Sequence, residues 1–232
     1  MTKSQSQKPL GQIVAVMPEA IGIYKIPINE HKLFKNSLIN IDQKAEDQLR
    51  RNDLLQKERL RHICNQRQQN IFKDFIELAQ LQEKLKEYSL NYFASIGFDC
   101  NEVIITDAWL NIGSKNAILP THLHSNAFLS GTYFVNFNPN IHSILNFYND
   151  RLMNGTERKP FLSIPSTPQR TVFNSKEIGL AINEGDVLYW RSHLLHGFSK
   201  PNQADGRITL SFNLMPKICH GDQYSFVVSN DY

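Results

Sequence analysis

The sequence is poor in several features that would each assign the protein to a class. Only three cysteines occur among its 232 residues, and none of them form a Cys-x-x-Cys pair. This small, odd number argues against a disulfide framework and is typical of reduced thiols in a cytosolic protein. No run of about 18 apolar residues is present, so we expect no membrane-spanning helix. The polar N-terminus MTKSQSQKPLGQ lacks the apolar centre of a signal peptide, and the cytoplasm is the expected compartment.

The chain also has little excess charge of either sign. Its formal net charge is +3, with 20% charged residues, which by itself indicates neither a nucleic-acid nor a membrane partner. The stretch 49–67 is locally basic, and we interpret it as a solvated helical face. A nucleic-acid or protein substrate and a homodimer stay open as partners.

Apolar residues, in contrast, are sufficient for one sizeable core, at 41% of the chain. We predict a single domain over 1–232, with a loose tail over 1–12, a strand plus a helical layer over 13–98, and a β core with the site over 99–232. Residues 30–95 are expected to be helical because their apolar side chains recur at helical spacing.

After Gly97 the sequence changes to short runs rich in β-branched and aromatic residues, separated by Gly, Pro and Asn. Such runs predict strands, here over 102–112, 127–136, 143–148, 185–190 and 207–215. Their spacing favours an antiparallel barrel or sandwich, so the expected fold class is α+β with a mainly β core. The long, Pro-containing segment 149–169 is expected to close over the substrate as a lid.

Three histidines are the candidates for a metal site. His122 and His124 stand two apart in THLHSNAFLSGTYF, and such residues on a strand point to one face. His196 follows far downstream in GDVLYWRSHLLHGFSKP. We expect these three rings to converge on a redox-capable metal, for which imidazole is a suitable ligand. His193 is expected at the rim of the site and His142 on the surface.

Iron oxygenases typically hold Fe(II) with two histidines and one carboxylate and leave positions open for a 2-oxo acid and O2. This chain departs from that set because His124 stands where the carboxylate is expected. His124 therefore either completes a three-histidine site or lies behind the ligands. Arg207 and Thr209 share one face of the strand in RITLSFN, and Arg207 offers a carboxylate two parallel donors.

Taken together, these motifs resemble a known family. THLHSNAFLSGTYF, FYNDRL at 147–152, EGDVLYWRSHLLHGFSKP and RITLSFN are similar to segments of 2-oxoglutarate/Fe(II) oxygenases that occur as hypothetical proteins in marine bacteria and phages. The resemblance extends over 109–215 and includes the His-x-His pattern. It implies a double-stranded β-helix, or jelly roll, with Fe(II) and 2-oxoglutarate as cofactor and co-substrate.

Other residues receive roles within this interpretation. Trp109 and Asn111 share one strand face, and we predict that Asn111 contacts the oxo acid while Trp109 lines the substrate site. Tyr133 is predicted to donate to the same carboxylate as Arg207. By the resemblance, Asp150 and Arg151 occupy an Asp-containing turn, where they contact substrate or pair with each other.

The expected function is an Fe(II)/2-oxoglutarate-dependent dioxygenase. It would use O2 to hydroxylate an unidentified organic substrate, with release of succinate and CO2. Two alternatives stay open, because jelly rolls have several functions. One is a three-histidine dioxygenase that does not use 2-oxoglutarate, and the other is a non-catalytic module that binds a metal or ligand or serves as a phage structural protein.

Overall fold

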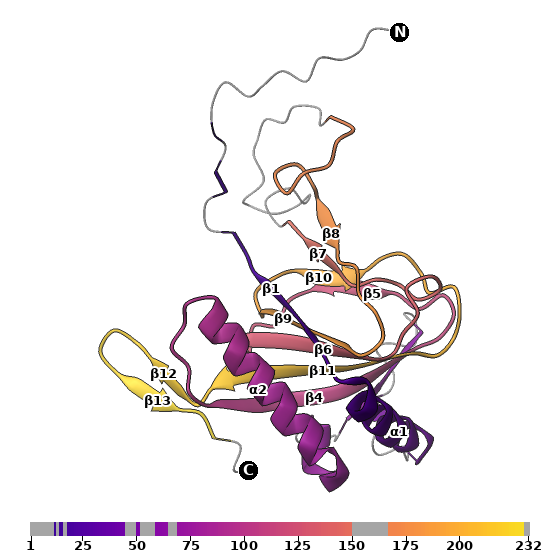
Figure 1. The fold of residues 1–232 in the computed structure, drawn as a ribbon, viewed down its shortest axis with the longest axis horizontal. Coiled ribbons are helices and arrows are strands. Elements are labelled where there is room, and N and C mark those ends of the chain that lie inside the picture. The colour runs from indigo at the N-terminus through magenta and orange to yellow at the C-terminus, as the bar shows by residue number, and fades with distance from the viewer. Residues whose placement is uncertain are drawn as a thin grey trace, which may run out of the picture.

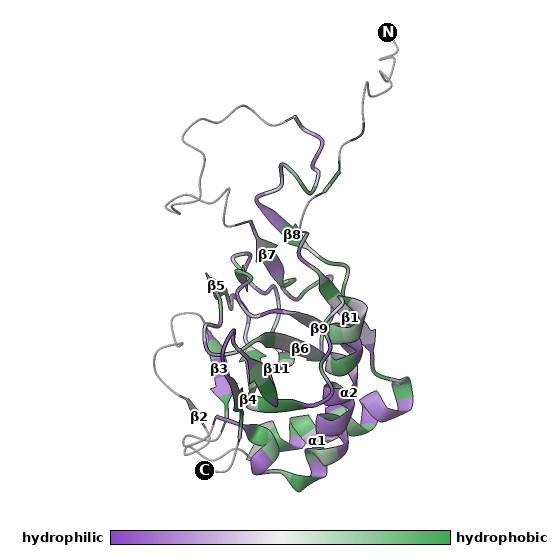
Figure 2. Cartoon of the chain, turned by 90° about the vertical axis from the view of Figure 1, so that its left-hand side faces the viewer, coloured by the Kyte–Doolittle hydropathy of each residue, from purple (hydrophilic) through white to green (hydrophobic). Residues whose placement is uncertain are grey.

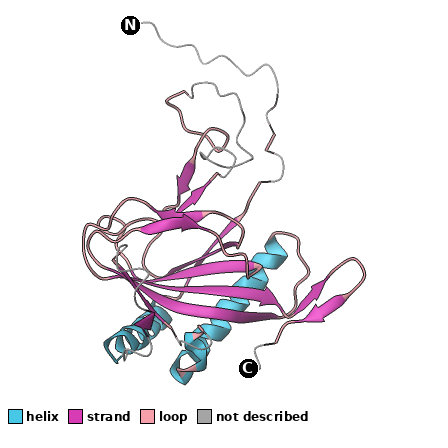
Figure 3. Ribbon diagram, turned by 180° about the vertical axis from the view of Figure 1, so that it is seen from behind, coloured by secondary structure: helices cyan, strands magenta, loops and turns pink. Residues whose placement is uncertain are grey.

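The computed structural model describes residues 12, 14–15, 18–44, 50–51, 59–64, 69–149 and 167–229. In this part of the chain two antiparallel sheets lie face to face, and two α-helices cover the outer side of the larger sheet (Figures 1 and 3). This arrangement is a jelly roll with an N-terminal helical layer, as the sequence predicted.

The larger sheet is the framework of the molecule. Its strands run in the order β1-β9-β6-β11-β4-β3-β2. Their bounds are Ile21–Lys25 for β1, Asp186–Arg191 for β9, Leu129–Asn136 for β6, Arg207–Pro216 for β11, Val103–Gly113 for β4, Leu60–Ile63 for β3 and Arg50–Arg51 for β2. The long strands β4 and β11 pair along almost their whole length at the centre of the sheet.

The smaller sheet consists of short strands in the order β5-β10-β7-β8. Their bounds are Leu119–His122 for β5, His196–Phe198 for β10, Asn146–Tyr148 for β7 and Glu177–Gly179 for β8. A separate hairpin of β12 (Ile218–His220) and β13 (Ser225–Val227) projects from the end of β11 (Figure 1).

The alternation along β11 divides the sheet into two faces. Ile208, Leu210, Phe212 and Leu214 belong to the main hydrophobic core on the helix side, so the intervening polar residues face the smaller sheet. A second apolar cluster, which includes Trp190, lies between the two sheets. Figure 2 shows hydrophobic residues on β4 and β11 beside the helices.

The helices α1 (Ile28–Lys44) and α2 (Ala79–Ser95) pack on the outer face of the larger sheet. Leu81 and Leu85 of α2 are fully buried in the main core. The hydroxyl of Tyr189 on β9 donates to the Leu85 carbonyl at 2.7 Å and so ties this helix to the sheet. Short 3-10 turns at Ile71–Lys73 and Ile76–Leu78 precede α2.

The predicted helical region over 30–95 was wrong in its middle. Residues Arg50–Arg51 and Leu60–Ile63 form β2 and β3, which extend the larger sheet beyond β4. The basic stretch 49–67 is therefore not one helical face, although residues 49, 52–58 and 65–67 lie outside the described part of the chain. Strand β3 is stabilised by pairing with β4. This partner is distant in sequence, so the local periodicity of the stretch does not reveal it.

The strands predicted after Gly97 are present with small shifts at their ends. Cys64, Cys100 and Cys219 are free thiols. None of the described helices is long and apolar enough to cross a membrane. The predicted tail, except for Gln12, and residues 150–166 of the predicted lid lie outside the described residues.

Replacement of Leu85 by Ala tests the packing of α2 on the sheet. We expect the free energy of unfolding to fall by about 2–5 kcal/mol, because a fully buried leucine is lost. Urea denaturation followed by circular dichroism measures this. Ile76→Ala is the control, since Ile76 is 86% exposed and should change stability by less than about 0.5 kcal/mol. Equal losses in both variants would contradict the assigned packing.

Candidate metal centre

Three histidine rings meet where β5 ends and β10 begins. His122 is paired with His196 in the smaller sheet, and His124 lies two residues beyond β5. The ring centroids are 4.4 Å apart for His122 and His196, 5.0 Å for His124 and His196, and 5.2 Å for His122 and His124. One ring nitrogen from each lies within 4.8 Å of the others. The structure thus brings together the three histidines that the sequence singled out.

The same nitrogen is left for a ligand in all three rings. Nδ1 of His122 and Nδ1 of His196 each lie 2.8 Å from a backbone carbonyl oxygen, that of Pro120 and that of Leu194 respectively. A carbonyl only accepts, so both Nδ1 atoms carry the proton and both Nε2 atoms keep a lone pair. Such a bond from the second ring nitrogen is typical of metal-binding histidines.

The third ring is held by side chains instead of carbonyl groups. Nδ1 of His124 lies 2.6 Å from Oδ1 of Asn213 and 3.0 Å from Oγ of Ser130. The amide of Asn213 is oriented because its Nδ2 donates to a carboxylate oxygen of Asp107 at 3.4 Å. Ser130 Oγ also donates to the Asn213 oxygen and contacts Oγ of Ser192 at 2.8 Å. His124 therefore donates from Nδ1 and keeps its Nε2 lone pair, as the other two rings do.

Burial keeps the imidazoles of His196 and His124 neutral. It lowers the pKa of His196 to about 3, with a further contribution from the neighbouring His122. Burial also lowers the pKa of His124, against the opposing effects of the bond to Asn213 and the charge of Asp107. A neutral imidazole is the form that binds a metal, so the site is prepared for one near neutral pH.

The register of the larger sheet places polar residues side by side on its inner face. Asn213, Ser211 and Thr209 of β11 each stand opposite one residue on β4 and one on β6. The rows are Asp107–Asn213–Ser130, Trp109–Ser211–Thr132 and Asn111–Thr209–Phe134. Asn213 and Ser130 of the first row contact His124. The other two rows lie between His124 and Arg207.

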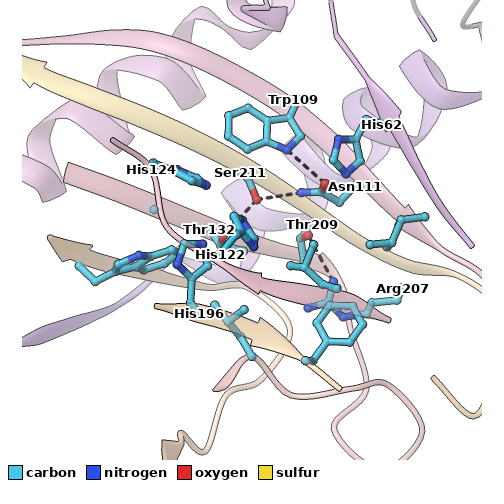
Figure 4. A pocket seen from close by; sticks show the side chains of 16 residues that line it. His62, Trp109, Asn111, His122, His124, Thr132, His196, Arg207, Thr209 and Ser211 are labelled. Atoms are coloured by element: carbon cyan, nitrogen blue, oxygen red, sulfur yellow. Dashed lines mark hydrogen bonds between the residues drawn. The ribbon is translucent and has the colours of Figure 1, made fainter. Parts of the chain in front are cut away.

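A chain of hydrogen bonds crosses the middle of the pocket (Figure 4). Nε1 of Trp109 donates to Oδ1 of Asn111 at 3.1 Å, and Nδ2 of Asn111 donates to Oγ of Ser211 at 2.8 Å. Ser211 and Thr132 hydroxyls are 3.1 Å apart. Trp109 and Asn111 thus both line the pocket, and their polar groups also hold each other in place.

Arg207 lies beyond this chain, at the other end of the pocket from His124 (Figure 4). Its side chain is only 2% exposed, and its guanidinium carbon lies 4.6 Å from the ring centroid of Phe198. Nε donates to the Ser143 carbonyl, and Nη1 lies 3.5 Å from the Thr209 hydroxyl. No carboxylate among the described residues pairs with it. Burial lowers its pKa to about 10, and the guanidinium stays charged at neutral pH.

The pocket between the histidines and Arg207 has a volume of about 60 Å³. Leu60 and His62 of β3 line it as well, and both were missed from the sequence because that stretch was expected to be helical. Their alternating positions, two apart, were the available signal.

Tyr133 was wrongly predicted to contact the co-substrate. Tyr133 lies in the main core on the helix side of β6, and its hydroxyl is 2.6 Å from Nδ1 of His31 on α1. The neighbouring Thr132 lines the pocket instead. The physical reason is that both faces of β6 are buried, so the period of two does not say which face is the pocket.

The remaining predicted residues divide into two groups. Asp150 and Arg151 lie outside the described residues. His193 is exposed and pairs with Glu19 at 2.9 Å, whereas His142 is buried and not on the surface as expected. Its Nδ1 accepts from the backbone N–H of Asn138.

A family comparison covers the part of the chain that contains this site. Residues 107–213 match the model of a family described as "Putative 2OG-Fe(II) oxygenase". No curated protein matches the chain.

Similar solved structures include several enzymes of different activity. The non-heme alpha ketoglutarate dependent carbocyclase SnoK from nogalamycin biosynthesis has a TM-score of 0.62 at 9% identity, over 86% of this chain and 81% of that one. HygX from Streptomyces hygroscopicus, crystallised with nickel, 2-oxoglutarate and hygromycin B, has a TM-score of 0.53 at 13% identity, over 85% and 83%. A Pseudomonas putida prolyl-4-hydroxylase has a TM-score of 0.53 at 11% identity, over 84% and 92%. At these identities the likeness establishes the jelly-roll fold.

Gly197→Ala tests how the histidines are brought together. A Cβ at Gly197 would lie 2.6 Å from the Leu119 carbonyl oxygen and 3.0 Å from that of Pro120. Backbone atoms cannot rotate away, so β10 should move off β5 and separate His196 from His122. We expect Ni²⁺ binding, measured by calorimetry, to weaken at least about tenfold.

Gly179→Ala is the matched control in the same sheet. The nearest contact of a Cβ there would be the side-chain oxygen of Asn146 at 2.6 Å. A side chain, unlike the backbone, can rotate aside, so metal affinity should be unchanged. Wild-type affinity in Gly197→Ala would show that the close strand approach does not position the rings.

Proposed function

We propose that the chain is an Fe(II)- and 2-oxoglutarate-dependent dioxygenase that hydroxylates an organic substrate, on the premise that residues 107–213 match the 2OG-Fe(II) oxygenase family. The observation that carries the proposal is a single pocket with two complementary ends. One end has three histidines, and the other has a buried guanidinium that no described carboxylate pairs with.

The histidine end fits a divalent metal. Each ring has its Nδ1 bound to an oxygen, so that Nε2 is left to offer its lone pair to a metal. We propose that His122, His124 and His196 hold the iron. Bound iron would supply O2 activation coupled to the oxidative decarboxylation of 2-oxoglutarate to succinate and CO2.

The guanidinium end fits the far carboxylate of 2-oxoglutarate. A buried cation is costly unless an anion pairs with it, and Arg207 with Thr209 offers donors that suit a carboxylate. We propose that Asn111 contacts the same molecule through the middle of the pocket. The neighbouring phenyl rings, including Phe198, exclude water from this pair and so strengthen it.

The primary substrate would enter where the pocket opens beside the histidines. Trp109 is only partly buried there, and we propose that it contacts the substrate. Asp150 and Arg151 keep the substrate-contacting role proposed from the sequence.

Reconstitution of the metal and co-substrate tests the proposal directly. Fe(II) and 2-oxoglutarate added without oxygen should produce a visible charge-transfer band, and admission of O2 should release succinate. Metal binding without either signal would favour a three-histidine enzyme that does not use the oxo acid. A chain that binds no metal would be a binding module instead.

His122→Ala and His196→Ala are each expected to abolish tight metal binding, because each removes one of the three lone pairs. Metal content after challenge with a chelator measures this. His193→Ala is the control, since this exposed residue is close in sequence but pairs with Glu19. Wild-type retention of metal in both site variants would contradict the assignment.

Arg207→Ala should leave metal binding nearly intact and weaken 2-oxoglutarate binding. By analogy with buried charge pairs the loss is about 2–5 kcal/mol, measurable by calorimetry on the metal-loaded protein. Arg191→Ala is the control. It removes an arginine that is only partly buried and lies over Phe98 and Phe128, and it should have no effect on 2-oxoglutarate binding. Equal affinities in the Arg207 variant and the native protein would exclude the role.

A further inference from the structure

The three side chains that face the metal position, His122, His124 and His196, are all imidazoles and none is a carboxylate. The positive charge of a bound ion must therefore be offset by a group outside this set. A set of two histidines and a carboxylate contributes one negative charge, whereas three neutral imidazoles contribute none. His196 is only 3% exposed, so water does little to stabilise a divalent ion beside it.

The structure contains a carboxylate one amide away from His124. Nδ1 of His124 donates to Oδ1 of Asn213 over 2.6 Å, and Nδ2 of the same amide donates to Asp107 Oδ2 over 3.4 Å. Each hydrogen bond polarises the next in such a chain. Electron density is therefore drawn from the carboxylate through the amide toward the ring.

The sheet is built so that these groups meet. Asn213 on β11 is the register partner of Asp107 on β4 and of Ser130 on β6. The pairing of β4 with β11 becomes irregular immediately after Asn213, since Leu214 pairs with Ile105. Bulges of this kind change the direction of a side chain near a site. Thr106 is the extra residue of this bulge, and its hydroxyl donates to Asp107 Oδ2 at 2.9 Å.

We propose that Asp107 and Asn213 are positioning residues that act through His124 and supply the negative charge that the three-histidine set lacks. The proposal rests on the proposed function, because it needs a metal at these histidines. It differs from a purely structural role of Asp107, since the charge of the carboxylate and not only its shape is required.

Asp107→Asn separates charge from shape. The new amide oxygen still accepts from Asn213 and from Thr106, so the geometry is retained while the charge is lost. We expect the affinity for Ni²⁺, measured by calorimetry on metal-free protein, to fall by about 10-fold or more, within the range of about 10–100-fold found for groups that support metal ligands. Asp99→Asn, which removes an exposed acid, is the control for net charge.

The double variant Asp107→Asn/Asn213→Asp gives a second, independent measurement. It exchanges the amide and the carboxylate, so the overall charge is native and the carboxylate binds His124 directly. We expect native or tighter Ni²⁺ affinity, a rescue that a structural role does not predict. The midpoint of thermal unfolding of every variant shows whether it folds.

The outcomes are distinguishable. Equal Ni²⁺ affinity of Asp107→Asn and Asp99→Asn would overturn the inference and leave the proposed function intact, and so would a double variant that folds but is not rescued. If Asp107→Asn does not fold, the double variant decides alone. A native protein that does not bind Ni²⁺ would overturn the proposed function and this inference with it.

Discussion

The register of β11 between β4 and β6 is the constraint on which both the core and the pocket depend. Every second residue of this strand packs against the helices, and the residues between them face the smaller sheet. A shift of one residue would exchange the two sets, with Arg207 in the apolar core and Phe212 in the pocket. The apolar contacts of β11 therefore fix the register. The same register positions the polar groups of the site, so no additional backbone has to be ordered for them.

The smaller sheet adds the second requirement, a close approach of two short strands. Its strands β5 and β10 are too short to hold a register by length alone, and their pairing begins at the histidines themselves. The absence of a side chain at Gly197 lets β10 lie against the carbonyl groups of β5. Those strands present His122 and His196, whereas His124 depends on side chains of the larger sheet. The metal position is thus held from both sheets at once.

The features predictable from the sequence were those carried by short-range patterns. The alternation in RITLSFN placed Arg207 and Thr209 on one face, and the two-residue spacing of His122 and His124 indicated convergence, although His124 lies beyond the strand. Features that depend on partners distant in sequence were missed. β3 forms because β4 offers it an edge, and Asp107 meets His124 only through Asn213. Tyr133 was assigned to the wrong face because burial on both sides of β6 removes the contrast that alternation normally provides.

The position of the family match within the larger sheet has a consequence for how the molecule is assembled. Residues 107–213 contain β9, β6 and most of β11 and β4, which are consecutive strands at the centre of that sheet. Both outer neighbours, β1 beside β9 and β3 beside β4, come from the preceding segment. A chain trimmed to the family match would therefore expose two rows of unpaired backbone groups, one at each side of the sheet. Open edges of this kind invite pairing between molecules, so the N-terminal segment also acts as protection against aggregation.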